Sequence, residues 1–471
     1  MKKILTLIVL SSFTIVTSQT KLVSHHLDLK KPKASQQLLN VVNPDTEEVY
    51  TLASDKESTT VLRFNSALFF SDSLTVKRPD KQYTFMAGFS IENKQSPYVY
   101  WASEDFDKIL AVQYDFQTKK ATEKAYTLPL QDETVLATFS ENSSFYILCN
   151  NDKAQKLELY VFKNGNREQK TFDFENTNFI TAKGKTVKLN SILQDYPIQS
   201  IDTKSFNSLL SCTQKTKLYI TANKLVLTFD HNPKETQLFE INLDSYSIAE
   251  YKIAQPQLKA AATKSNSFFD KDLLYQLKYN ESELALYAKN ITTNTVTKSF
   301  TVTQNDTIAF KTSPLYSQTG EQRPKQLKST KKFLDKLSTS EPGISVYHLN
   351  GNLLLTIGGA KSIATTGMIV LGVAASVGSI MTGTGGDMSS LLEPSTSQVL
   401  YFESFVENAY QTIKTPQGPL AVDFISEFME QNNEAYLNNT FVYKDFYILG
   451  YYDSESKQYV MRKFADEGLD N

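Results

Sequence analysis

The chain has 471 residues with 12% aromatic and 21% charged side chains, and its formal net charge at pH 7 is −2. A balance this close to neutral over such a length argues against a nucleic-acid or other polyanionic partner. Only 17 glycines and 14 prolines are present, which together with the aromatic content excludes a low-complexity chain and favours a large packed core.

Residues 1–18 have the order of a secretory signal peptide. Two lysines form a basic start, residues 4–16 are mostly apolar, and small residues precede a cleavage site before Gln19. The apolar run is too short to cross a bilayer comfortably. We therefore expect an exported protein, periplasmic or extracellular, with residues 19–471 as its single mature domain.

From about residue 48 onward, short apolar and aromatic runs alternate with turn residues, as in the hairpins of an all-β protein. Four turns share the pattern Asp/Asn-x-x-Ser/Thr, bounded by Asp115 and Thr118, Asp244 and Ser247, Asn290 and Thr293, and Asp453 and Ser456. The Asp or Asn oxygen can accept a backbone N–H two residues on, and the hydroxyl can bond back across the loop. We expect these residues to fix hairpin register, since none of the turns has the alternating oxygen ligands of a calcium loop.

A further hairpin is predicted at Asn164-Gly165-Asn166, because both central residues of a type I′ turn need positive φ. Units such as Tyr98-Val99-Tyr100 followed by the run from Ile109 to Thr118 resemble blades of the β-propeller superfamily. The resemblance covers most of the mature chain and implies about seven blades, with six or eight as alternatives. The sequence has no Trp-Asp dipeptide, no kelch glycine pair in each unit and no sialidase-type Asp box with its Trp, so no subfamily is assigned.

Three insertions interrupt the strand pattern. The spacing of apolar residues predicts a basic helix over residues 324–338 and an acidic helix over residues 421–436. Residues 360–397 form an insertion inside a blade hairpin, and its part from 362 to 386 has no charge among twenty-five residues, sixteen of which are Gly, Ala, Ser or Thr.

The uncharged insertion has three interpretations. It packs on the propeller surface, or it forms a flap that touches a partner or a membrane surface, or it crosses a membrane once. A crossing would place the final strands on the other side of the membrane from the rest of the ring, so we predict that the chain is not a single-pass membrane protein. The candidate contact residues are Met368, Ile369, Leu371, Val373, Val377, Ile380 and Met381.

Residues of redox or metal chemistry are few. Cys149 and Cys212 can form a disulfide in an exported protein, or they can remain two buried thiols, and sequence leaves both open. His25 and His26 are expected in a polar tail, and no histidine has ligand spacing to a cysteine. No catalytic, cofactor-binding or metal-ligating residue is predicted.

The function predicted from these features is a non-enzymatic binding scaffold for a protein, glycan or envelope component. The first alternative is a propeller hydrolase or lyase that acts on polysaccharide or peptide with residues in the central channel, which would require several carboxylates or a histidine to converge there. The second is a structural envelope protein that assembles or touches membrane through residues 362–386.

Overall fold

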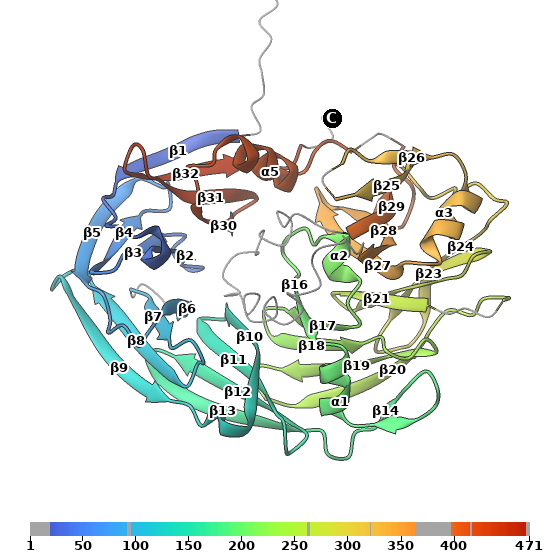
Figure 1. The fold of residues 1–471 in the computed structure, drawn as a ribbon, viewed down its shortest axis with the longest axis horizontal. Coiled ribbons are helices and arrows are strands. Elements are labelled where there is room, and N and C mark those ends of the chain that lie inside the picture. The colour runs from blue at the N-terminus through green and yellow to red at the C-terminus, as the bar shows by residue number, and fades with distance from the viewer. Residues whose placement is uncertain are drawn as a thin grey trace, which may run out of the picture.

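The computed structural model describes residues 19–91, 96–260, 264–320, 322–362, 397–414 and 417–467. Within these ranges the strands pair into seven sheets of four or five strands and one small two-stranded sheet. The seven larger sheets are arranged as blades around a common centre (Figure 1), so the predicted all-β propeller is confirmed and the blade number among the described strands is seven.

Blades 1 to 3 are four-stranded antiparallel meanders in chain order. Blade 1 contains β2 (Gln37–Val42), β3 (Val49–Ser54), β4 (Ser58–Phe64) and β5 (Phe70–Lys77). Blade 2 contains β6 (Phe85–Ser90), β7 (Tyr98–Ala102), β8 (Lys108–Asp115) and β9 (Lys120–Thr127). Blade 3 contains β10 (Glu133–Glu141), β11 (Ser144–Asn151), β12 (Lys156–Lys163) and β13 (Asn166–Asp173).

Blade 5 repeats this plan, whereas blades 4 and 6 modify it. Blade 4 adds β16 (Ile198–Asp202), parallel to β17 (Thr216–Ile220), before β18 (Lys224–Phe229), β19 (Glu235–Asn242) and β20 (Ile248–Ala254). Blade 5 contains β21 (Lys264–Asp270), β22 (Leu273–Tyr279), β23 (Glu283–Asn290) and β24 (Val296–Thr303). Blade 6 has the order β27 (Glu341–Leu349), β28 (Asn352–Ser362), β29 (Ser397–Val406), β25 (Leu315–Thr319) and β26 (Lys325–Leu327).

Blade 7 closes the ring with strands from both ends of the described chain. It contains β30 (Leu437–Tyr443), β31 (Phe446–Asp453), β32 (Gln458–Phe464) and, paired antiparallel with β32, β1 (Gln19–His26). Figure 1 shows β1 along the outer edge of this blade. His25 and His26 therefore belong to a closing strand, not to the polar tail expected from sequence.

Helices and short strands fill the connections. They are η1 (Lys33–Ser35), η2 (Leu130–Asp132), β14 (Phe179–Ile180), β15 (Thr186–Val187), α1 (Leu189–Asp195), α2 (Leu209–Cys212), α3 (Thr330–Leu337) and α5 (Ala421–Gln431). The helix expected over residues 324–338 begins only at Thr330, because Lys325–Leu327 pairs with β25 and the Ser329 hydroxyl caps the helix by accepting from the Lys332 N–H.

The core is divided among the spaces between neighbouring blades. Five separate clusters of buried apolar side chains join blades 1 and 2, 2 and 3, 3 and 4, 6 and 7, and 7 and 1, and one larger cluster joins blades 4, 5 and 6. Each blade buries both faces, so its middle strands are mostly apolar. In β12, for example, every residue from Leu157 to Phe162 is buried. Burial between sheets, at about 25 cal/mol per Å², is the main force that holds the ring together.

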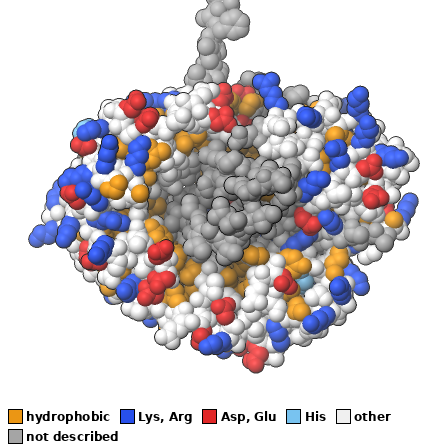
Figure 2. Space-filling view, viewed as in Figure 1, with side chains coloured by type: hydrophobic (Ala, Val, Ile, Leu, Met, Phe, Trp, Pro, Cys, Tyr) orange, Lys and Arg blue, Asp and Glu red, His pale blue; other side chains and the backbone are white. Residues whose placement is uncertain are grey.

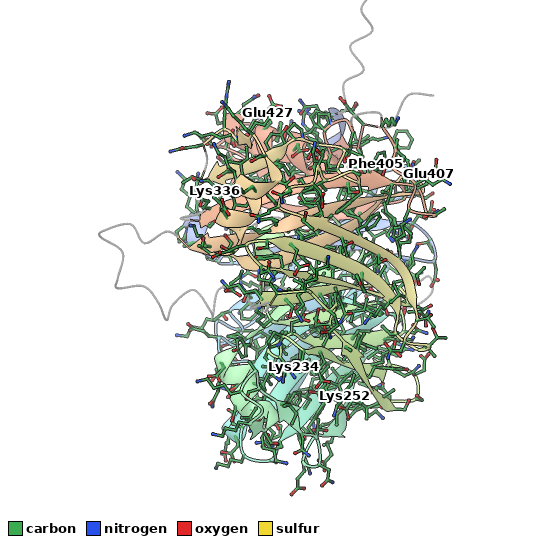
Figure 3. The ribbon with its side chains drawn as sticks, turned by 90° about the vertical axis from the view of Figure 1, so that its right-hand side faces the viewer. Lys234, Lys252, Lys336, Phe405, Glu407 and Glu427 are labelled. Atoms are coloured by element: carbon green, nitrogen blue, oxygen red, sulfur yellow. The ribbon has the colours of Figure 1, made fainter. Side chains whose placement is uncertain are left out.

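The two faces of the ring carry different turns. Because neighbouring strands of a blade are antiparallel, the first and third connections of a four-stranded blade lie on one face, which we call the odd-turn face, and the second lies on the other. Figure 3, a side view, places Glu407, just after the end of β29, and Lys336 of α3 on opposite faces. Figure 2 shows one of the faces, where hydrophobic side chains gather around the centre and Lys and Arg lie mainly toward the rim.

The uncharged insertion connects two paired strands, β28 and β29. β28 and β29 are antiparallel along their length, and the last pair is Ser362 with Ser397. Residues 360–362 and 397, which we assigned to the insertion, therefore continue the strands. The candidate contact residues between Met368 and Met381 lie outside the described residues, as does the expected signal peptide at 1–18.

Within the ranges that the structure describes, helices are short, and none has both the length and the apolar character that a membrane crossing requires.

Candidate functional site

The Asx turns form at the third connections of blades 2, 4 and 5 and at the second connection of blade 7. In blade 2 the Asp115 carboxylate accepts from the Gln117 N–H at 2.8 Å, from the Thr118 N–H at 3.3 Å and from the Thr118 hydroxyl at 2.6 Å. The Asn290 side chain accepts the corresponding three bonds in blade 5, and Asp453 accepts the two backbone bonds in blade 7. All these bonds stay within one turn, and each turn holds the register of the two strands that it joins.

In blade 4 the turn is anchored two residues earlier than the sequence pattern predicted. Asn242, not Asp244, accepts the N–H groups of Asp244 and Ser245 at 2.9 and 2.7 Å. Ser247 instead contacts the Ser245 hydroxyl at 2.9 Å. The true motif is Asn242-x-x-Ser245, and the error arose because an Asp follows the anchoring Asn at a spacing that also fits the pattern.

The fifth position of these four turns takes a left-handed backbone conformation. The residues with positive φ at this position are Lys119, Tyr246, Asn294 and Lys457, with φ between 51° and 56°, and the related turns at Asn43 and Asn151 place Glu47 and Gln155 there. Bulky residues rarely adopt this conformation. Tyr246 is the one aromatic side chain in this set, and it faces a pocket.

The pocket lies on the odd-turn face between blades 3 and 4 and has a volume of about 450 Å³. Three connections form it: the β10–β11 turn, the β12–β13 turn and the β19–β20 turn. Its lining residues are Asn142, Ser144, Tyr146, Val161, Lys163, Asn164, Asn166, Glu168, Leu243, Asp244 and Tyr246. Amide, hydroxyl, carboxylate and phenol groups dominate this list, above a few apolar side chains.

The two blade 3 turns are tight. Asn142 and Ser143 both have positive φ, at 46° and 57°, as do Asn164 and Gly165, at 49° and 65°. Positive φ at both central residues defines the type I′ turn, which matches the strand twist. The prediction of such a turn at Asn164-Gly165 is confirmed, while the one at Asn142-Ser143 was missed because its second residue is Ser and not Gly.

The β12–β13 turn is held from the side of blade 2. The Tyr126 hydroxyl donates to the Gly165 carbonyl, and the Lys124 ammonium donates to the Asn166 Oδ1 at 3.2 Å. A Cβ atom at Gly165 would lie 2.8 Å from the Tyr98 ring. The turn is therefore fixed by blade 2, while its other side lines the pocket against blade 4.

Two tyrosines give the pocket its aromatic character. The Tyr146 ring stacks on Phe139 with a centroid separation of 4.7 Å and an interplanar angle of 14°. Burial raises the pKa of Tyr146 to about 12, so its hydroxyl is protonated at neutral pH. Tyr246 packs against the core cluster between blades 3 and 4, and the Lys170 ammonium lies 4.5 Å from its ring centroid.

Charges around the pocket are nearly balanced. Glu168 pairs with Lys170 at 2.9 Å, and Glu141 beside the β10–β11 turn pairs with Lys204 at 2.8 Å. Lys163 and Asp244 are the remaining ionisable groups of the lining apart from the tyrosines. The side chains of the lining can therefore both donate and accept hydrogen bonds beside an aromatic surface, and neither positive nor negative charge is in strong excess.

The two cysteines do not form a disulfide. Both are free and buried, Cys149 on β11 in the cluster between blades 2 and 3 and Cys212 in α2 in the cluster of blades 4 to 6. Burial raises the pKa of both thiols, which keeps them protonated and unreactive.

At the odd-turn ends of the inner strands of blades 5 and 6, His348 meets Asp270. The His348 Nε2 lies 3.0 and 2.9 Å from the two carboxylate oxygens, and the histidine side chain is one-third exposed. The Tyr275 and Tyr410 hydroxyls, also between blades 5 and 6, are 2.9 Å apart and buried. Within the described ranges no group of three or more His, Cys, Asp or Glu side chains could hold a metal ion.

Comparisons with known proteins add only weak likenesses. No protein-family model and no curated protein matches the chain. Among solved structures, the WD40 domain of SCAP from fission yeast has a TM-score of 0.32 at 9% identity, covering 95% of this chain and 87% of its own. The Dos1 propeller has a TM-score of 0.28 at 7% identity, covering 95% and 96%.

A crystal structure of an ACO/RPE65 chimera has a TM-score of 0.29 at 10% identity, and the alignment covers 58% of this chain and 63% of that one. The chain therefore spans less than two thirds of that structure's length. The propeller fold rests on the strand pairing described above, and these likenesses say nothing about function.

Proposed function

We propose that the protein is an exported, non-enzymatic binding scaffold, and that its ligand, a protein, glycan or other envelope component, binds in the pocket between blades 3 and 4. The observation that carries this proposal is the pocket itself, where the β10–β11, β12–β13 and β19–β20 turns converge and Tyr246 lies in the wall. The left-handed conformation of Tyr246 is shared with Lys119, Asn294 and Lys457 at the same position of their turns, so it belongs to the turn geometry.

The architecture supports the proposal. Loops on a rigid scaffold commonly carry binding residues, because the framework fixes their positions while their sequences vary. Here three short turns from two blades converge, and each is held by internal or neighbouring hydrogen bonds. The residues need little rearrangement to receive a ligand, which lowers the entropy cost of binding.

The test is binding of the purified mature protein to a washed envelope fraction of the source cells. Asn166→Trp places a large side chain at the rim of the pocket and should abolish binding. Lys120→Trp is the matched control, because Lys120 is likewise the exposed first residue of the outermost strand, in blade 2. Equal binding of both variants and the wild type would contradict the proposal.

The His348–Asp270 pair supports a second candidate, a hydrolase or lyase acting on polysaccharide or peptide. A carboxylate bound to one imidazole nitrogen orients the ring and leaves the other nitrogen for proton transfer. Turnover of a chromogenic glycoside or peptide that disappears in His348→Gln, with unchanged envelope binding, would establish this activity. Absence of turnover with these substrates would count against it.

A further inference from the structure

The occupant of the interblade pocket can be specified by its chemistry. We propose that it is an uncharged saccharide, stacked against Tyr246 and hydrogen-bonded to the asparagine side chains of the rim; this inference rests on the proposed binding function. Volume, polar groups, charge and the aromatic wall each bear on this assignment.

The dimensions favour a small ligand or a terminal unit of a longer one. A pocket of about 450 Å³ falls within the range of small-molecule sites, whereas a protein partner needs a broad, flatter surface.

The polar groups match hydroxyls. An amide side chain both donates and accepts, and a carboxylate accepts two bonds side by side. A sugar ring presents adjacent hydroxyls that also donate and accept, so one ring can engage Asn142, Asn166 and Glu168 together. The Asn166 Oδ1 already accepts from Lys124 at 3.2 Å, and the Nδ2 group of the same amide is a donor that a sugar hydroxyl can accept from.

The charge balance argues against an ionic ligand. The lining contains Lys163, Glu168 and Asp244, and the lysine nearest to Tyr246 is paired with Glu168 at 2.9 Å. A phosphate, sulfate or carboxylate would meet two carboxylates with a single lining lysine to offset them. Burying such an anion without a dedicated cation is costly.

The aromatic wall supplies the apolar contact. One side of a sugar ring carries C–H groups, which pack on the face of an aromatic ring. Tyr146 is already stacked on Phe139, whereas the ring of Tyr246 packs against the core cluster between blades 3 and 4 and has the Lys170 ammonium 4.5 Å from its centroid. We assign the stacking surface to Tyr246, whose backbone is held by the bond from its N–H to the Asn242 carbonyl at 2.9 Å.

The experiment uses the mature protein and a panel of neutral methyl glycosides (glucoside, galactoside, mannoside, fucoside and N-acetylglucosaminide) in saturation-transfer NMR and calorimetry. At least one should bind, and Tyr246→Gly should weaken it by about tenfold, the loss expected for an aromatic contact. Glycine accepts positive φ, so the turn is retained. Lys457→Gly is the matched control at the same turn position in blade 7, and it should leave the affinity unchanged.

The outcomes separate the two proposals. If the envelope fraction binds in a Tyr246-dependent manner but no neutral glycoside binds or competes, the saccharide inference fails and the scaffold function stands. Stronger binding of methyl glucuronide than of the neutral glycosides would also overturn it. If Asn166→Trp has no effect on envelope binding, the pocket is not the site and both proposals fall.

Discussion

At the scale of single residues, side chains that bond to their own turn set the geometry of the odd-turn face. In the turn at Asn242, the side-chain oxygen accepts backbone N–H groups of the same turn, and the fifth residue, Tyr246, has positive φ. The site depends on this chemistry indirectly, because the turn anchored by Asn242 is what presents Tyr246 to the pocket. The pattern is structural in itself, yet it positions a residue that we assign to binding.

The first prediction distinguishes the two residues that fit the pattern in blade 4. Asn242→Ala should lower the free energy of unfolding by about 1 kcal/mol, because two turn N–H groups lose their acceptor. Asp244→Ala should change it by less than about 0.5 kcal/mol, as for an ordinary exposed position. Urea denaturation measures both. A larger loss for Asp244→Ala than for Asn242→Ala would contradict the assignment of the anchor.

At the scale of elements, α5 is attached to blades 6 and 7 through acidic side chains. Asp423 in its first turn accepts the Leu420 N–H at 2.8 Å, and Asp466 accepts from the Ala421 N–H at 2.8 Å and from the Tyr347 hydroxyl at 2.7 Å. Burial, and then the charge of Asp423, raises the pKa of Glu403 on β29. Burial, and then the charge of Asp466, likewise raises the pKa of Asp423.

The second prediction follows from that raised pKa. The folded protein holds the Glu403 proton more tightly than the unfolded chain, so this contribution to stability is present below the ordinary value of 4.5 and is lost as pH rises through the raised pKa. Glutamine does not ionise, so Glu403→Gln does not show this loss of stability. The free energy of unfolding of the variant minus that of the wild type should therefore be more positive at about pH 7 than at about pH 4.

Urea unfolding at both pH values measures the effect, and Glu407→Gln, an exposed glutamate just after the same strand, is the control. A difference between Glu403→Gln and wild type that does not vary with pH would contradict the assignment.

The third prediction concerns the closing strand. A truncated chain that starts at Lys30 lacks β1 and leaves β32 without its outer partner, so the midpoint of thermal unfolding should fall. Calorimetry measures the midpoint. A synthetic peptide of residues 19–29 added in trans should restore part of it, and a scrambled peptide should not. An unchanged midpoint would show that ring closure does not depend on β1.

At the scale of the whole molecule, a buried polar network joins blades 4, 5 and 6. The Lys217 ammonium and the Asp230 carboxylate are fully buried and lie 3.0 Å apart. Lys217 also donates to the Asn266 Oδ1 at 2.6 Å, Asp230 accepts from the Ser267 hydroxyl at 2.8 Å, and the Asn266 Nδ2 donates to the Pro342 carbonyl at 2.8 Å. Because hydrogen bonds are directional, this network fixes the position of the three blades relative to one another, whereas apolar contacts alone would allow one blade to shift along the next.

The fourth prediction tests this network. Lys217→Met leaves Asp230 buried without its counter-charge and should cost about 3–5 kcal/mol of unfolding free energy. In the double variant Lys217→Met with Asp230→Asn, the loss should be smaller than the sum of the two single losses, because the residues are coupled. Denaturant unfolding of all three variants measures the coupling. Additive losses would show that the pair contributes no specific interaction.

The sequence by itself determined the features that depend on neighbouring residues. Strand alternation and turn chemistry were sufficient for the all-β propeller, for the type I′ turn at Asn164-Gly165 and for the start of the helix expected over residues 421–436, because each arises within a few residues of chain. That helix ends at Gln431, before its expected end at residue 436. The tertiary structure alone decided what depends on distant segments. The pairing of β1 with β32, the separation of Cys149 from Cys212 and the meeting of three turns at the Tyr246 pocket all join residues far apart in the chain. Local sequence patterns do not predict such contacts, since they depend on how the blades pack around the ring.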